Sequence, residues 1–350
     1  MIDEKKYVKI VSNQTEGSNK TTVNNENITI TKNGVYEAQY PYTGYGRVSV
    51  ETYGIPREKE DNVLKRSIDP INLDGITEIG DYALAYAYYY YNLSNIPVVD
   101  FSNITTVKMS GMFSTFQMGR INKLNLHNLT TIGTSGCYYI CQGNTSLTEV
   151  DLSSLENINA NYAIARAFYG CSSLNVVKMN NLKTITATSG CEEIFSGCPS
   201  LISMDLGNLT TISGSNACKS MFNGCNYLTS VILTKLASVS GASACSYMFA
   251  SCLNLPTISF TALTSVSGSS AFDSIFRNCT SLESVYFPVL STVSGNSVFY
   301  NLLYGITGCT LHFSSSLDPE GGSTVISGLL GYPNFGGTNT TILFDLPALE

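Results

Sequence analysis

Apolar residues recur along the chain in short units whose first and third residues are apolar and whose middle residue is usually polar. This alternation is typical of a strand with one buried face. Ten such units occur: Ile71-Asn72-Leu73, Val99-Asp100-Phe101, Leu124-Asn125-Leu126, Val150-Asp151-Leu152, Val177-Lys178-Met179, Met204-Asp205-Leu206, Val231-Ile232-Leu233, Ile258-Ser259-Phe260, Val285-Tyr286-Phe287 and Leu311-His312-Phe313. The pattern predicts ten short strands that share one buried side.

The residues around these units return at a fixed step. A leucine, a phenylalanine and a cysteine column each advance by 27 residues: Leu147, Leu174, Leu201, Leu228, Leu255 and Leu282; Phe168, Phe195, Phe222, Phe249 and Phe276; Cys171, Cys198, Cys225, Cys252 and Cys279. Such a period indicates a solenoid in which one supersecondary unit forms one coil. Like residues of successive coils should therefore stack inside, with neighbouring strands about 4.8 Å apart in a parallel sheet.

Segments between the strands, such as Ala217-Cys218-Lys219-Ser220-Met221-Phe222, place apolar residues at helical spacing. They predict a short helix or 3₁₀ turn on the convex side. The expected fold is an α/β repeat: a solenoid of about ten coils over 69–313, with a parallel β-sheet on one face and short helices or turns on the other. Residues 1–55 read as a small all-β module, 56–68 as a charged linker and 314–350 as a C-terminal cap over the open end.

The eleven cysteines fit the repeat better than a disulfide framework. A column of five cannot pair completely, and Cys191 and Cys198 are too far apart for a bridge if the turn between them is helical. A buried, reduced column is therefore favoured, with structural disulfides as the alternative. For Cys137 and Cys141, ordinary packing is favoured over metal binding.

Three stretches carry a family resemblance. They resemble the AF-x-G-C-x-S-L-x-x-I-x-L signature of bacterial leucine-rich repeats of the BspA, or Treponema pallidum, type: IGDYALAYAYYYYNL at 79–93, ARAFYGCSSLNVVKM at 165–179 and KSMFNGCNYLTSVIL at 219–233. The resemblance covers about residues 69–313, although the repeat here carries a longer convex segment, such as SGSNAC, than is usual for the family. It implies an extracellular recognition or adhesion surface and no chemistry.

A second resemblance concerns the N-terminal module. ITITKNGVYEAQYPYTGYGRVSVE at 28–51 is similar to a stretch common near the start of phage tail and other virion structural proteins. It implies that residues 1–55 attach to other virion proteins. The N-terminus MIDEKKYVKIVS lacks the features of a secretory signal, so a route other than standard secretion is expected.

The leading hypothesis is a phage virion component, such as a tail fibre, a baseplate or a surface decoration, and the alternative is a bacterial surface or secreted adhesin. Analogy with fibres, which are often trimers, adds a homo-oligomer to the expected assemblies.

Composition narrows the function classes. A net charge of -7 with 13% charged residues disfavours nucleic-acid binding, and no apolar run reaches the about 20 residues of a membrane helix. His127 and His312 lie far apart, and no catalytic, metal or cofactor motif occurs, so neither an enzyme nor a cofactor is expected. The enzymatic alternative is a glycan hydrolase that uses aspartates of alternate coils, about 10 Å apart at the backbone, as an inverting pair.

The middle residues of the units should line the outer face of the sheet. This face is acidic and polar in the early coils and becomes neutral to aromatic at Ile232, Ser259 and Tyr286. Such a surface suits a protein or glycan partner. The candidate binding residues are Asp100, Asn125, Asp151, Lys178, Asp205 and Tyr286.

A run of tyrosines in the first coils forms a second candidate surface, made of Tyr88, Tyr89, Tyr90 and Tyr91. The four side chains cannot all point inward from one turn. They are interpreted either as packing under the N-terminal module or as a docking patch, where tyrosine is favoured because it is apolar at one end and polar at the other.

Overall fold

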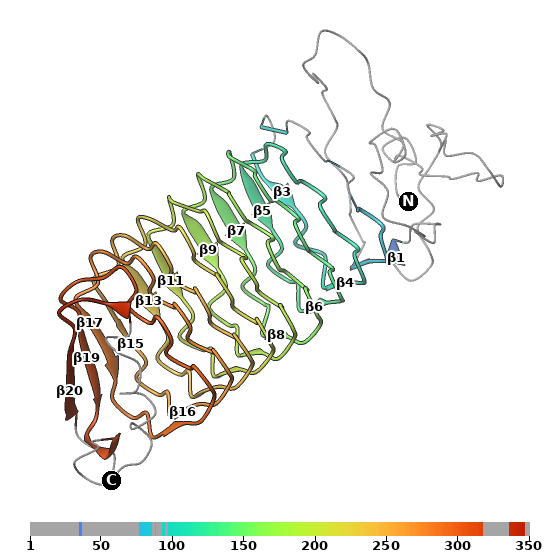
Figure 1. The fold of residues 1–350 in the computed structure, drawn as a ribbon. Coiled ribbons are helices and arrows are strands. Elements are labelled where there is room, and N and C mark those ends of the chain that lie inside the picture. The colour runs from blue at the N-terminus through green and yellow to red at the C-terminus, as the bar shows by residue number, and fades with distance from the viewer. Residues whose placement is uncertain are drawn as a thin grey trace, which may run out of the picture.

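The computed structural model describes residues 35–36, 77–85, 88, 93–94, 97–317 and 336–346. In these residues the chain winds as a parallel β-solenoid whose coils stack along one axis (Figure 1). Nine of the ten predicted units lie in described residues, and each overlaps a strand. The first unit, at 71–73, lies outside them. The solenoid predicted from the 27-residue step is confirmed.

One stack of strands, the main ladder, contains the predicted units. The strands are β3 (Val99–Asp100), β5 (Lys123–Asn125), β7 (Glu149–Asp151), β9 (Val176–Lys178), β11 (Ser203–Asp205), β13 (Ser230–Ile232), β15 (Thr257–Ser259), β17 (Ser284–Phe287), β19 (Thr310–Ser314) and β20 (Thr341–Leu346). They pair in parallel within three sheets, β3 to β9, β11 with β13, and β15 to β20, so that Met204 lies beside Val231 and Ile258 beside Val285. Inward residues such as Met204 are buried and the flanking residues are exposed.

A second stack of two-residue strands, the second ladder, follows the main strand in each coil. Where burial is described, it usually has a polar residue outside and a buried Ile or Val inside, as in Thr211 and Ile212. Its strands are β1 (Val35–Tyr36), β2 (Glu78–Ile79), β4 (Thr106–Val107), β6 (Thr131–Ile132), β8 (Asn157–Ile158), β10 (Thr184–Ile185), β12 (Thr211–Ile212), β14 (Ser238–Val239), β16 (Ser265–Val266) and β18 (Thr292–Val293). The apolar-x-apolar pattern did not predict this ladder, because a two-residue strand is too short to show a period.

The third side of each coil is a chain of tight turns, and the expected helix does not form there. In the coil at 214–225, Lys219 N donates to Asn216 O at 3.1 Å, whereas Ser220 N donates to Ser246 O of the next coil at 2.8 Å. Positive φ angles at Asn216, Ser220 and Gly224 interrupt right-handed winding every fourth residue. Alternate amides therefore bond within the coil and between coils, which leaves no i to i−4 ladder. These stretches are called the turn segments below.

Identical residues stack inside the coils. The rings of Phe168, Phe195, Phe222, Phe249 and Phe276 form one column with centroids 5.6 to 5.8 Å apart. All eleven cysteines are buried and free, in agreement with the reduced column favoured by the sequence. The thiols also form hydrogen bonds, because those of the cysteine column donate to backbone carbonyls of the preceding coil, as Cys225 Sγ does to Phe195 O at 3.2 Å. Burial raises the pKa of Cys225 to about 12, so this thiol stays protonated at neutral pH.

Strands continue both ladders toward the chain ends. β1 pairs in parallel with β2, so residues 35–36 extend the second ladder, and the rest of the predicted module at 1–55 lies outside the described residues. β20 pairs in parallel with β19, and Phe344 stacks on Phe313 with centroids 6.0 Å apart. This part of the tail adds one more apolar layer to the core. Within the described ranges, the chain forms no helix of the length and apolarity that a membrane crossing needs.

Candidate functional site

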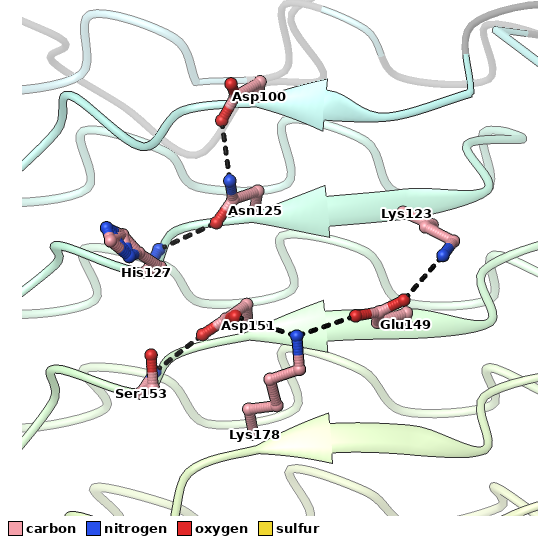
Figure 2. Close-up of polar contacts among 8 residues, drawn as sticks. All are labelled: Asp100, Lys123, Asn125, His127, Glu149, Asp151, Ser153 and Lys178. Atoms are coloured by element: carbon pink, nitrogen blue, oxygen red, sulfur yellow. Dashed lines mark hydrogen bonds and ion pairs between the residues drawn. The ribbon is translucent and has the colours of Figure 1, made fainter.

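The main ladder brings the early candidate residues side by side on its outer face. Register pairs place Asp100 beside Asn125, Asn125 beside Asp151, and Asp151 beside Lys178, on four neighbouring strands (Figure 2). Asp205 lies further along the ladder, beside Ile232. The outward column predicted from the middle residues of the units is therefore present.

The acidic and amide members of this column close the turns that follow their strands. Asp100 Oδ1 accepts from Ser102 N at 3.0 Å, Asn125 Oδ1 from His127 N at 3.1 Å and Asp151 Oδ1 from Ser153 N at 3.0 Å. An Asp or Asn that accepts from the amide two residues on forms an Asx turn. Asp205 makes the same contact with Gly207 N at 2.8 Å. These side chains thus have a structural role that accounts for their recurrence.

The charges of the early coils are satisfied by one another. Glu149 bridges Lys123 at 2.7 Å and Lys178 at 3.0 Å, and Lys178 also reaches Asp151 at 3.1 Å (Figure 2). Hydrogen bonds from Lys123 and Lys178 lower the pKa of Glu149. Burial alone would raise the pKa of Asp151, but bonds from Ser153 and Lys178 outweigh it and the net shift is downward. Both carboxylates are therefore ionised and paired at neutral pH.

Removing Lys178 should weaken the fold in a pH-dependent way. Carboxylates with lowered pKa values stabilise the folded state above their unfolded values of about 4, and this contribution is lost as the pH falls through the folded values. The pKa of Lys178 is raised, chiefly by hydrogen bonding to Glu149, so its contribution persists until the pH rises past about 10. Lys178→Met should therefore lower the midpoint of urea unfolding at pH 7. The difference should be no more than an exposed ion pair provides, about 1 kcal/mol.

The difference between wild type and Lys178→Met should shrink below pH 3 and in high salt. Lys235→Met is a suitable control, because Lys235 Nζ contacts the amide oxygen of Asn208 and forms no ion pair with any residue that the structure describes. An equal gap at acid and neutral pH would show that the loss comes from packing of the lysine stem.

The C-terminal end of the face has a different character. The ring of Tyr286 on β17 stacks on that of His312 on β19, with centroids 4.4 Å apart and planes 12° apart. The Nδ1 atom of His312 lies 2.9 Å from Asp345 Oδ2, on β20. The two histidines of the chain lie far apart, since His127 follows β5 and His312 lies on β19. Among the described residues, no group of three or more His, Cys, Asp or Glu side chains is arranged to hold a metal ion.

Comparison with models of known protein families identifies the family of this chain. A model described as BspA type leucine rich repeat region matches six copies over residues 65–186, 143–274 and 192–317. The chain belongs to the BspA-type leucine-rich repeat family.

Comparison with individual proteins adds only weak likenesses to this BspA-type repeat protein. The crystal structure of a leucine-rich repeat protein from Bacteroides ovatus is 18% identical, covers 78% of this chain and 67% of its own, and has a TM-score of 0.38. The crystal structure of the pneumococcal vaccine antigen PcpA is 14% identical, covers 77% of this chain and 85% of its own, and has a TM-score of 0.23. No curated protein matches the chain.

The tyrosine run of this BspA-type chain is described only in part. Tyr88 is buried in the core, and its ring stacks on Phe116 of the next coil with centroids 5.5 Å apart. Tyr89, Tyr90 and Tyr91 lie outside the described residues, so the docking alternative remains a prediction for them.

Exposed aliphatic side chains on the main ladder were largely missed from the sequence. Val176, Ile202 and Ile232 are 42%, 56% and 46% exposed, on or next to β9, β11 and β13. Only Ile232 stood at a middle position of a predicted strand. The signal was a break in the alternation, since Ile202 follows the inward Leu201 directly and Val176 precedes the inward-column residue Val177. We call these three residues the aliphatic patch.

Proposed function

We propose that this chain is a non-enzymatic recognition protein whose main ladder docks on the surface of another protein. The aliphatic patch carries the proposal. The candidate polar residues of the early coils close turns or pair with one another, whereas Val176, Ile202 and Ile232 expose apolar surface to water on neighbouring coils. Apolar side chains exposed on a rigid face can form the centre of a protein interface.

The aspartate column supports a binding role more than a hydrolytic one. An inverting glycosidase needs one carboxyl with a raised pKa to act as an acid. Asp151 has a lowered pKa and bonds to Lys178, and Asp100 Oδ1 accepts from Asn125 Nδ2 at 2.8 Å as well as from the turn amide. A glycan surface is the alternative partner, favoured by the Tyr286 and His312 stack at the end of the ladder.

For location, we propose a phage virion, in which the chain is a tail-fibre, baseplate or surface-decoration protein that residues 1–55 attach to the particle. The motif at 28–51 supports this placement. The alternative is a bacterial surface or secreted adhesin, and membership of the BspA-type family favours it. Immunogold labelling of purified phage particles and of intact cells of the source bacterium separates the two, because label on the particles is expected in the first case and label on the cells alone in the second.

Binding through the main ladder is tested with paired substitutions. The purified chain should bind intact cells of the source bacterium, or of the phage host, and Ile202→Asp with Ile232→Asp should weaken that binding about ten-fold or more. Ser240→Asp with Ser267→Asp is the matched control, because it adds the same charge at exposed positions beside the second ladder. Equal loss in both pairs, or in neither, would contradict a docking role for the aliphatic patch.

A further inference from the structure

Aromatic side chains gather on the turn segments of three successive coils, away from the core. The rings of Phe113 and Tyr138 are 5.4 Å apart, Tyr138 and Tyr162 are 6.0 Å apart, and Tyr139 lies against both Tyr138 and Phe113. Tyr162 is 41% exposed and the other three rings are half-buried. We call these four residues the aromatic cluster.

A chain of polar contacts fixes this cluster from one side. The Tyr138 and Tyr139 hydroxyls are 3.0 Å apart, Arg166 Nη1 donates to Tyr139 Oη at 2.8 Å, and Arg166 Nη2 lies 2.9 Å from Glu193 Oε1. The charge of Arg166 is thus balanced by Glu193. A guanidinium has five N–H donors, so Arg166 keeps donors beyond these two contacts. The cluster is rigid, close to neutral and carries hydroxyl and guanidinium groups at its edge.

The fold does not require large side chains at these positions. Other coils place Ala165 and Ser246 at the position of Tyr138, and Ser220 and Ser274 at the position of Tyr139. At the position of Tyr162, the coil at 81–85 has Tyr82, whereas seven coils have serine or asparagine: Ser110, Ser135, Ser189, Asn216, Ser243, Ser270 and Ser297. Small residues therefore suffice to build the turn segments.

The backbone makes these large residues unfavourable as well. Tyr139, Tyr162 and Arg166 have φ angles of 59°, 56° and 51°. Positive φ suits Asn and Gly and is uncommon for bulky residues. Bulky side chains held in such strained positions cluster at functional sites. Their cost to the fold points to a ligand.

We infer that the aromatic cluster binds a neutral oligosaccharide chain, at a site separate from the main ladder. Phe113, Tyr138 and Tyr162 come from three successive coils, so each coil contributes one ring. A linear glycan that runs along the solenoid could place one sugar unit against each of these rings. Sugar rings offer C–H faces to aromatic rings and hydroxyls to the Tyr and Arg groups. The balance between Arg166 and Glu193 favours a ligand without net charge.

The test uses the full chain in native gels that contain a soluble neutral polysaccharide, either mixed-linkage β-glucan, xyloglucan, galactomannan or α-mannan. At least one should retard the wild type. Tyr138→Ala and Tyr162→Asn should each weaken that retardation about ten-fold or more. Tyr247→Ser is the control, because Tyr247 occupies the Tyr139 position three coils beyond Arg166 and should not affect binding.

Thermal unfolding separates a binding role from a structural one. Tyr162→Asn should unfold at the same temperature as the wild type or higher, because Asn tolerates positive φ better than Tyr does. A lower unfolding temperature would make Tyr162 a structural residue and overturn the inference. No retardation by any of the four polysaccharides, or retardation by acidic alginate alone, would also overturn it. Neither result bears on docking by the aliphatic patch, which lies on another side of the coil.

Discussion

Replacing Phe222 by Ala should lower the free energy of unfolding by about 3 to 5 kcal/mol. Phe222 is fully buried in the middle of the phenylalanine column, with ring centroids 5.8 Å from Phe195 and 5.6 Å from Phe249. The substitution removes both ring contacts and leaves a cavity between two coils. Because each coil of a solenoid contacts only its neighbours, the defect cannot be relieved by the rest of the array. Chemical denaturation followed by circular dichroism measures the loss.

Asp205→Asn is the matched control for Phe222→Ala, in the same coil but on the outer face. Asp205 is exposed, and its contact is the Oδ1 acceptor for Gly207 N, which the amide oxygen of Asn also provides. This variant should unfold within about 0.5 kcal/mol of the wild type, as surface changes usually do. If the two variants lost the same stability, the inward assignment of the phenylalanine column would be wrong.

The columns that define the core could be read from the sequence because identical residues meet there. A fixed step of 27 residues places Phe195, Phe222 and Phe249 at the same point of successive coils, so period alone predicts their contact. The turn segments were harder, because buried pairs such as Ala217 and Cys218, then Met221 and Phe222, recur every four residues. That spacing is close to the 3.6 residues of a helix, and the pattern cannot distinguish the two.

The outer face was only partly predictable. The middle residues of the units were placed correctly, but whether Asp151 closes a turn or awaits a ligand depends on where its oxygens point. The aliphatic patch arises from residues beside the predicted columns, such as Ile202, whose exposure depends on the twist of the chain before β11. The aromatic cluster joins Phe113, Tyr138 and Tyr162 from three coils, and their contact required the path of the turn segments.

Replacing Gly241 by Val should destabilise the solenoid by about 3 kcal/mol or more, because successive coils approach too closely there for a side chain. A Cβ atom on Gly241 would lie 2.0 Å from the carbonyl oxygen of Gly214 and 2.5 Å from its carbon. Gly268 meets Gly241 in the same way, so the clash involves backbone on a neighbouring coil. The strands on either side are hydrogen-bonded in register, so moving the coils apart would break bonds of the second ladder.

The loss of stability at Gly241 should increase with the size of the side chain that replaces the glycine. Two earlier coils carry Ala160 and Ala187 at the equivalent position, so the coil path can adjust to a methyl group. Gly241→Ala should therefore cost less stability than Gly241→Val, and Ser240→Ala, at the exposed neighbouring position, should leave the unfolding midpoint unchanged.

In the Gly241→Val variant, hydrogen exchange should show a loss of protection that is centred on β12, β14 and β16 and fades along the array, since coupling in a solenoid is between nearest neighbours. A uniform loss over all coils would mean that the array unfolds as one cooperative unit, and a Gly241→Val variant as stable as the wild type would show that the close approach of the coils does not hold them in register.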